Sequence, residues 1–177
     1  MFERRLAAAA ASFAWLACAA AQEGPGLGVP ATPEQVAGWD VSIGPDGAGL
    51  PPGSGTAAAG KTVYEAKCAA CHGVDGAGQP NDRLVGGQGT LKEAAPIRTI
   101  GSYWPYATTV FDYVRRAMPY VTPHSLTPDE TYALTAYLLA LNGVIEQNAV
   151  MDATTLPKVV MPNRANFDSA YREPRRR

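Results

Sequence analysis

The sequence has little net charge, few cysteines and no long internal hydrophobic run. Its 177 residues include 15 Lys and Arg against 16 Asp and Glu, which gives a formal charge of −1. A nucleic-acid-binding protein would carry a basic excess, so that class is not expected. The longest internal apolar stretch, around residues 132–141, is far shorter than the roughly 20 residues of a membrane span. We therefore expect no membrane span in the mature chain.

Glycine and proline are abundant, with 18 Gly and 15 Pro, while 46% of the residues are hydrophobic. The hydrophobic content is sufficient to bury a core, and the Gly and Pro content indicates long loops. Most of residues 22–56 follow a Gly- and Pro-rich pattern without periodicity, so we predict an extended N-terminal arm there. Residues 143–177 also lack periodicity and are predicted to form a C-terminal extension.

The first 21 residues have the order of regions found in secretory signal peptides. Arg4 and Arg5 precede an apolar run over residues 6–17, and small residues at 19–21 provide a cleavage site. We predict that residues 1–21 are removed and that the mature chain is periplasmic. An uncleaved N-terminal anchor and lipidation of Cys18 stay open as alternatives.

Only three cysteines are present, and the two outside the signal peptide lie in the motif from Cys68 to His72, Cys-Ala-Ala-Cys-His. This spacing is typical of covalent haem c attachment, in which Cys68 and Cys71 form thioethers and His72 lies beneath the iron. A thioredoxin-like redox pair would need a βαβ context, which the sequence lacks. A zinc site would need four ligands, and His124 is the one further Cys or His in the mature chain.

The periodicity predicts an all-α domain over residues 57–142. Helices are expected at residues 57–68, 106–117 and 127–142, with a Gly-rich loop after the haem motif. A further short helix is predicted to begin at Thr32, because Thr caps helices and Pro33 suits the first turn. No internal repeat is present.

Met118 is the best candidate for the second axial ligand of the iron. It lies at the end of a predicted helix, and Pro119 releases it from helical geometry. A thioether favours Fe(II) and so raises the reduction potential. Met151, Met161 and His124 stay open as alternatives.

Aromatic residues between the first two long helices are candidates for the haem pocket. Tyr103, Trp104 and Tyr106 would wall the haem, although ordinary packing explains them equally well. The ring nitrogen of His72 that does not bind iron needs an acceptor, and the carbonyl of Pro80 is expected to provide it. Gly60 and Tyr64 are expected to face Tyr137 on the last helix.

The haem motif, the helix before it, the late Met118 and the closing helix together resemble class I cytochromes c. Further strings are similar to the cytochrome subunits of sulfur dehydrogenase (SoxD) and of bacterial sulfite dehydrogenases. These strings are residues 30–33, 39–41, 50–55, 64–68, 99–107, 115–119, 126–142 and 161–164.

The resemblance implies a class I cytochrome c fold with extended N- and C-terminal arms and one covalently bound haem c. It gives Cys68 and Cys71 the thioether roles, and His72 and Met118 the axial roles. It also implies a partner, a molybdenum-cofactor protein of the sulfite oxidase type, and a downstream cytochrome or oxidase that receives the electrons. The arms are expected to wrap this partner.

The sequence departs from this family in its number of haem motifs. The full sulfur-dehydrogenase cytochrome carries a second haem domain. Only one Cys-x-x-Cys-His motif is present here. A single-haem partner of a sulfite dehydrogenase therefore fits as well as a sulfur-dehydrogenase subunit. With both axial positions filled, the chain is expected to transfer electrons and not to be catalytic on its own. A free diffusible carrier and a haem enzyme with Met118 unbound remain alternatives.

Overall fold

The computed structural model describes residues 28–167, so the predicted signal peptide lies outside the described residues. The chain divides into two units, one up to Trp39 and one from Asp40 onward. In the first unit, α2 (Pro33–Trp39) is exposed along its whole length. Its start is a reciprocal cap, because the backbone N–H groups of Gln35 and Thr32 each donate to the other's side chain, at 3.2 and 2.9 Å. The predicted short helix is confirmed.

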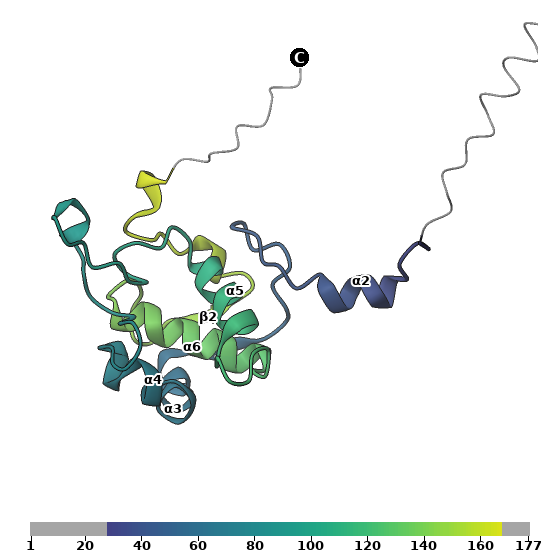
Figure 1. Ribbon diagram of the computed structural model, residues 1–177, viewed down its shortest axis with the longest axis horizontal. Coiled ribbons are helices and arrows are strands. Elements are labelled where there is room, and N and C mark those ends of the chain that lie inside the picture. The colour runs from purple at the N-terminus through teal and green to yellow at the C-terminus, as the bar shows by residue number, and fades with distance from the viewer. Residues whose placement is uncertain (1–27, 168–177) are drawn as a thin grey trace, which may run out of the picture. The chain divides into compact units, whose positions relative to one another are not determined.

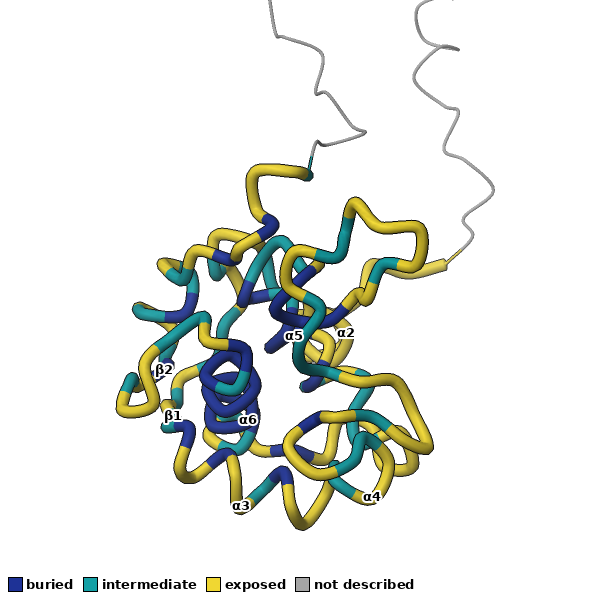
Figure 2. Tube along the Cα trace, turned by 90° about the vertical axis from the view of Figure 1, so that its left-hand side faces the viewer, coloured by how far each residue is buried: buried dark blue, intermediate teal, exposed yellow. Residues whose placement is uncertain are grey.

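The second unit is mostly helical, as predicted, and each long helix begins and ends within one residue of its expected bounds. In Figures 1 and 2, α3 and α4 lie on one side of α6, and α5 lies on the other. The helices are α3 (Ala57–Lys67), α4 (Ala69–His72), α5 (Ala107–Ala117) and α6 (Pro128–Leu141). Short 3₁₀ helices lie at Val74–Gly76, Thr90–Lys92, Leu156–Lys158 and Arg164–Asn166, and two short strands are β1 (Ser54–Thr56) and β2 (Val150–Asp152).

Helix α6 forms the centre of this unit. Residues 131–140 are all buried, and Figure 2 shows the helix end-on with the other elements around it. Its start is fixed by a capping box, in which Thr127 and Glu130 accept each other's backbone N–H groups. A helix apolar on all sides is expected where other elements cover every face.

Helix α3 packs closely on α6 at Gly60. A Cβ atom at this position would overlap the carbonyl of Ala133, so only glycine permits the approach. One turn later, the rings of Tyr64 and Tyr137 pack with their centroids 5.4 Å apart. The expected pairing of Gly60 and Tyr64 with the last helix is confirmed.

Residues 40–56, expected to belong to an extended arm, pack on the helices. The N–H of Ile43 donates to Asp112 on α5 at 3.1 Å, and the hydroxyl of Tyr132 on α6 donates to the carbonyl of Pro51 at 2.9 Å. Strand β1 then pairs antiparallel with β2, with Ser54 opposite Asp152. The loop takes part in these bonds through its backbone groups, so the sequence pattern of its side chains does not predict them.

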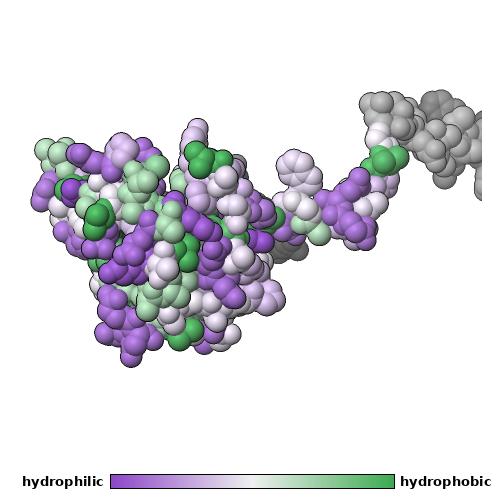
Figure 3. Space-filling view, turned by 90° about the horizontal axis from the view of Figure 1, so that it is seen from below, coloured by the Kyte–Doolittle hydropathy of each residue, from purple (hydrophilic) through white to green (hydrophobic). Residues whose placement is uncertain are grey.

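The C-terminal extension also packs on this unit as far as the structure describes it. Its apolar side chains Met151, Leu156 and Met161 are buried in the same core as α5 and α6. On the face shown in Figure 3, hydrophobic residues lie in small groups among hydrophilic ones. Within residues 28–167, no helix is both long enough and apolar enough to cross a membrane.

Candidate haem-binding site

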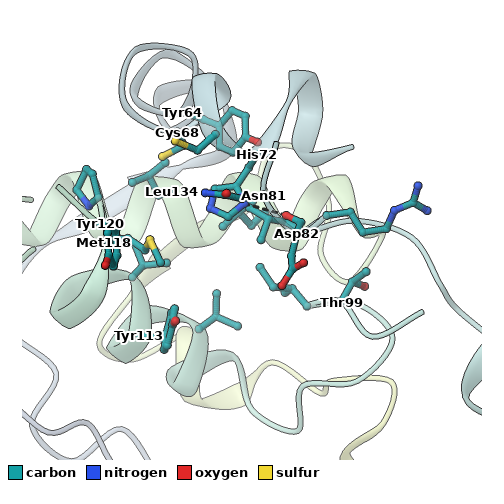
Figure 4. Close-up of a pocket in the computed structure, with 18 of the residues that line it drawn as sticks. Tyr64, Cys68, His72, Asn81, Asp82, Thr99, Tyr113, Met118, Tyr120 and Leu134 are labelled. Carbon is teal, nitrogen blue, oxygen red and sulfur yellow. Dashed lines mark hydrogen bonds between the residues drawn. The ribbon is translucent and has the colours of Figure 1, made fainter. Parts of the chain in front are cut away.

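A cavity of about 470 Å³ opens between α4, the end of α5 and the side of α6. Its volume lies within the usual range for ligand pockets, about 300–1,000 Å³. Figure 4 shows Cys68, His72 and Met118 at this cavity, although they come from different elements. The apolar part of the wall comes from Ile100, Trp104, Val110, Val114, Leu134 and Leu138.

The haem motif is held by the junction of α3 and α4. Helix α3 ends at Lys67, and the next residue, Cys68, caps it with an N–H that donates to the carbonyl of Tyr64 at 2.8 Å. Cys68 and Cys71 both line the cavity, and both are free thiols in the chain. Burial raises the pKa of the Cys68 thiol to about 11, so this thiol is protonated at neutral pH. At Gly73 the backbone has a φ of 75°, and a Cβ atom would overlap the carbonyl of Gly78, so the chain can turn here only at glycine.

The ring of His72 is oriented by the backbone of the loop that follows. Its Nδ1 lies 2.9 Å from the carbonyl oxygen of Asp82, where the sequence predicted Pro80. The reason is the path of the loop, since the N–H of Asn81 donates to the carbonyl of Cys71 at 2.8 Å. This bond brings the carbonyl of residue 82, and not that of residue 80, to the ring. Nε2 is left as the nitrogen available to a metal.

Met118 lies where the sequence analysis expected it, directly after α5. Its backbone is extended, with φ −121° and ψ 149°, and its half-buried side chain lines the cavity. Met151 and Met161 are 5% and 1% exposed, belong to the core and do not line the cavity. His124 is exposed in the loop before α6 and also lies outside the lining.

The structure separates the three aromatic residues predicted for the pocket. Trp104 lines the cavity and packs edge-on against Tyr113, with 5.6 Å between the ring centroids. Tyr103 lies outside the lining, with the guanidinium of Arg98 5.4 Å from its ring and Phe167 packed against its edge. Tyr106 also lies outside the lining, so of the three only Trp104 is placed to contact a bound haem.

Two tyrosines fix the segment after the motif, and the sequence analysis predicted neither of their hydrogen-bond partners. The hydroxyl of Tyr64 donates to the carbonyl of Gly73 at 2.9 Å, and that of Tyr137 donates to Asp75 at 2.6 Å. Burial raises the pKa of Tyr64 to about 12, and burial with the Asp75 bond raises the pKa of Tyr137. Asp75 has a φ of 51°. Asp tolerates this conformation better than most residues do, and this preference is the local sequence signal for its role.

The donor set fits haem c. Two thiols three residues apart, an imidazole held at Nδ1 and a thioether all line one cavity with a largely apolar wall. Within residues 28–167, no group of three or more His, Cys, Asp or Glu side chains is placed to hold a metal ion. The zinc alternative therefore finds no ligand set in this part of the chain.

Comparison with known proteins identifies the family. The cytochrome c family model matches residues 57–142. A chain in the crystal structure of the sulfane dehydrogenase SoxCD from Paracoccus pantotrophus is 44% identical, with a TM-score of 0.78. The match covers 82% of this chain and 72% of that one. A search of curated proteins gave no match.

These matches confirm the predicted class I cytochrome c fold, and the family carries a covalently bound haem c. The chain belongs to the class I c-type cytochromes, close to SoxD, and is an electron-transfer cytochrome.

Proposed function

We propose that this chain is a periplasmic mono-haem cytochrome that accepts electrons from a molybdenum-cofactor subunit of the sulfite oxidase type. It would pass them to a downstream cytochrome or oxidase of the respiratory chain. The observation that carries the proposal is the 44% identity, over 82% of this chain, with a chain of the sulfane dehydrogenase SoxCD. The dehydrogenase partner, the periplasmic location and the single haem are parts of this proposal.

We assign the thioether bonds to Cys68 and Cys71, and the axial positions to His72 and Met118. When bound, haem c supplies a one-electron Fe(III)/Fe(II) couple. The carbonyl of Asp82 accepts from Nδ1–H of His72, which fixes the ring and leaves Nε2 for the iron. The thioether of Met118 favours the reduced state. With His72 and Met118 both holding the iron, no position on it would be open to a substrate, so the bound group would supply electron transfer alone.

The exposed surface beside the haem motif is the proposed electron port. Ala70 is exposed there, and Val74 is 77% exposed directly after the motif. A haem joined to Cys68 and Cys71 would have an edge next to these residues. A partner that buries this surface would shorten the path for electrons.

A free diffusible carrier is the second candidate, and one observation favours it. Residues 40–56 and the described part of the C-terminal extension pack on this chain's own helices. Their length is therefore explained without a partner, which weakens the expectation that both arms wrap one. Among the described residues, only 28–39, with the exposed α2, are left as an arm of unassigned role.

The partner is tested by capture of the tagged holo-protein from the periplasm. The eluate is assayed for molybdenum and for haem reduction by sulfite and by other sulfur donors. Molybdenum with sulfite-dependent reduction supports a sulfite dehydrogenase subunit, and reduction only by other donors supports the sulfur-dehydrogenase branch. A haem protein without molybdenum, inert to both, overturns the partner and leaves the free carrier.

A matched pair of variants tests the port in the same assay. Val74→Asp places a charge at the proposed contact, where burying it without a partner is unfavourable. Val160→Asp does the same at a valine that is 80% exposed, far along the chain from the haem motif. We expect Val74→Asp to slow haem reduction by the partner roughly tenfold, because removing a contact worth about 1.4 kcal/mol has that effect. Equal rates in the two variants would place the port elsewhere.

A further inference from the structure

The C-terminal residues 161–167, here named the tail segment, contact the loop that carries Trp104. We propose that the tail segment is a positioning element of the haem site. It holds residues 103–106 so that Trp104 closes one wall of the cavity against water. The inference rests on haem binding, and it does not depend on which partner supplies electrons.

Three contacts join the tail segment to this loop. The side-chain amide of Asn163 donates to the carbonyl of Tyr103 at 2.8 Å. The guanidinium of Arg164 lies over the ring of Tyr106, 4.3 Å from its centroid. The ring of Phe167 packs edge-on against Tyr103, with 5.2 Å between the centroids. The contacts therefore fall on both sides of Trp104.

The Asn163 amide is itself held in one orientation. Its Oδ1 accepts from Nδ2 of Asn166 at 2.8 Å, so its NH₂ group is directed at the carbonyl of Tyr103. Asn163 is only 6% exposed, and Met161, two residues earlier, is buried in the core. A buried amide with both ends bonded is a fixed element of the fold, because unpaired buried polar groups are costly. A loose tail would not bury it.

Few hydrogen bonds hold the backbone of residues 104–106 within the described part of the chain. The N–H of Tyr103 donates to the carbonyl of Thr99 at 3.0 Å, but within residues 28–167 no backbone bond joins residues 104–106 to another loop. Tyr106 starts α5 without a side-chain cap. The side chain of Trp104 packs on Tyr113 and against the core, and the tail segment adds contacts to the residues on either side of it.

The consequence for the haem site is electrostatic. The reduction potential of a haem depends on its exposure to solvent, among other factors. Water stabilises the additional positive charge of Fe(III), so a wall that excludes water favours Fe(II). Loosening Trp104 would admit water and lower the reduction potential. The tail segment thereby acts on the cavity without contacting it.

The test uses the full-length holo-protein and two readouts, hydrogen exchange of the Tyr103 amide, which donates to the carbonyl of Thr99, and the reduction potential of the haem. Asn163→Ala removes the donor, and Asn163→Asp keeps the side-chain shape but cannot donate to a carbonyl. Phe167→Ala removes the edge contact at a half-buried position, where loss of folding is not expected. Val160→Ala, at an exposed valine just before the tail segment, is the control.

We expect the Tyr103 amide to exchange about fivefold faster in both Asn163 variants, which corresponds to one net hydrogen bond, and we expect both variants to have a lower potential than Val160→Ala. Phe167→Ala should likewise speed the amide exchange and lower the potential. Unchanged exchange, or faster exchange with an unchanged potential, would overturn the inference. So would a loss of partner affinity with both readouts unchanged, since the tail segment would then belong to the partner interface. Neither readout needs the partner, so failure of the proposed function would be seen separately.

Discussion

The orientation of His72 depends on a backbone carbonyl and not on a side chain. The sequence shows that such an acceptor is needed, because a haem-binding histidine requires one, but it does not show which residue provides it. That choice depends on the hydrogen bond from Asn81 to Cys71 and on the left-handed conformation of Gln79, with a φ of 81°. Asp82 was therefore found only in the structure.

The assignment of Met118 makes the first residue-scale prediction. Met118→Ala removes the thioether that lines the cavity after α5. Axial ligands set haem potentials over a range of about 0.8 V, so we expect the potential to fall by about 0.1 V or more. The absorption that accompanies sulfur-to-iron bonding should disappear from the oxidised spectrum. Both are measured on the purified holo-protein by spectroelectrochemistry.

Met151→Leu is the control for this change, because Met151 is buried in the core, does not line the cavity and lies outside the tail segment. A volume-conserving substitution there should cost less than about 1.5 kcal/mol and leave the spectrum unchanged. If the oxidised spectrum of Met118→Ala matched that of the parent protein, Met118 would not be a ligand. The haem-enzyme alternative would then gain support.

At the scale of elements, the α3–α6 pair was the most predictable feature of the fold. Its signals are local, namely the capping box of Thr127 and Glu130 and a glycine one turn before Tyr64. The bond between Tyr137 and Asp75 was not predictable, since it joins residues 62 positions apart through a turn with positive φ. Sequence periodicity places helix faces, but it does not place the loop residues that meet them.

The buried tyrosines at this interface predict a loss of stability in alkali. Burial raises the pKa of Tyr64 to about 12 and also raises that of Tyr137, so both remain protonated in the folded chain after they ionise in the unfolded chain. The contribution of these two tyrosines to the free energy of unfolding is complete below pH 10. It is lost as the pH rises from 10 toward their pKa values in the folded chain. Each should lower the free energy of unfolding by up to about 1.4 kcal/mol per pH unit above pH 10.

Tyr137→Phe should reduce the fall of the unfolding free energy with pH by the part that one tyrosine contributes. At pH 7 it should lower the free energy of unfolding by about 1 kcal/mol, because the hydrogen bond to Asp75 is lost. The measurement is denaturant unfolding of the holo-protein followed by circular dichroism between pH 7 and pH 11.5. Tyr120→Phe is the control, because Tyr120 is 82% exposed. An unchanged slope in Tyr137→Phe would show that Tyr137 ionises equally in both states.

At the scale of the whole molecule, the sequence predicted the helical domain and its family but not the packing of its flanks. Residues 40–56 are rich in Gly and Pro and have no periodicity, so nothing local marks them as structured. They are held by non-local bonds, such as Ser54 opposite Asp152 and Tyr132 to Pro51, which a sequence pattern does not encode. The haem-binding residues were predictable because their signal is local, since Cys68, Cys71 and His72 lie in one short motif.

This packing decides which part of the N-terminal arm can be removed to test partner binding. Deletion up to residue 54 would take away Ile43 and Pro51, whose backbone groups bond to α5 and α6, and would destabilise the domain. Deletion of residues 22–39 leaves those bonds intact, since the second unit begins at Asp40. We expect it to leave the unfolding midpoint and the haem spectrum unchanged.

If the arm binds the dehydrogenase subunit, the same deletion should weaken the complex at least about tenfold, which corresponds to 1.4 kcal/mol. Trp39 is the expected main contributor, because it is 87% exposed and aromatic side chains commonly dominate interfaces. Trp39→Ala should therefore reproduce most of the loss, whereas Glu34→Ala, at an exposed position of the same helix, should not. The affinities are measured by titrating the captured molybdenum subunit with each holo-variant. An unchanged affinity after deletion would leave the arm without a role in the complex and would place the contact on the haem domain itself.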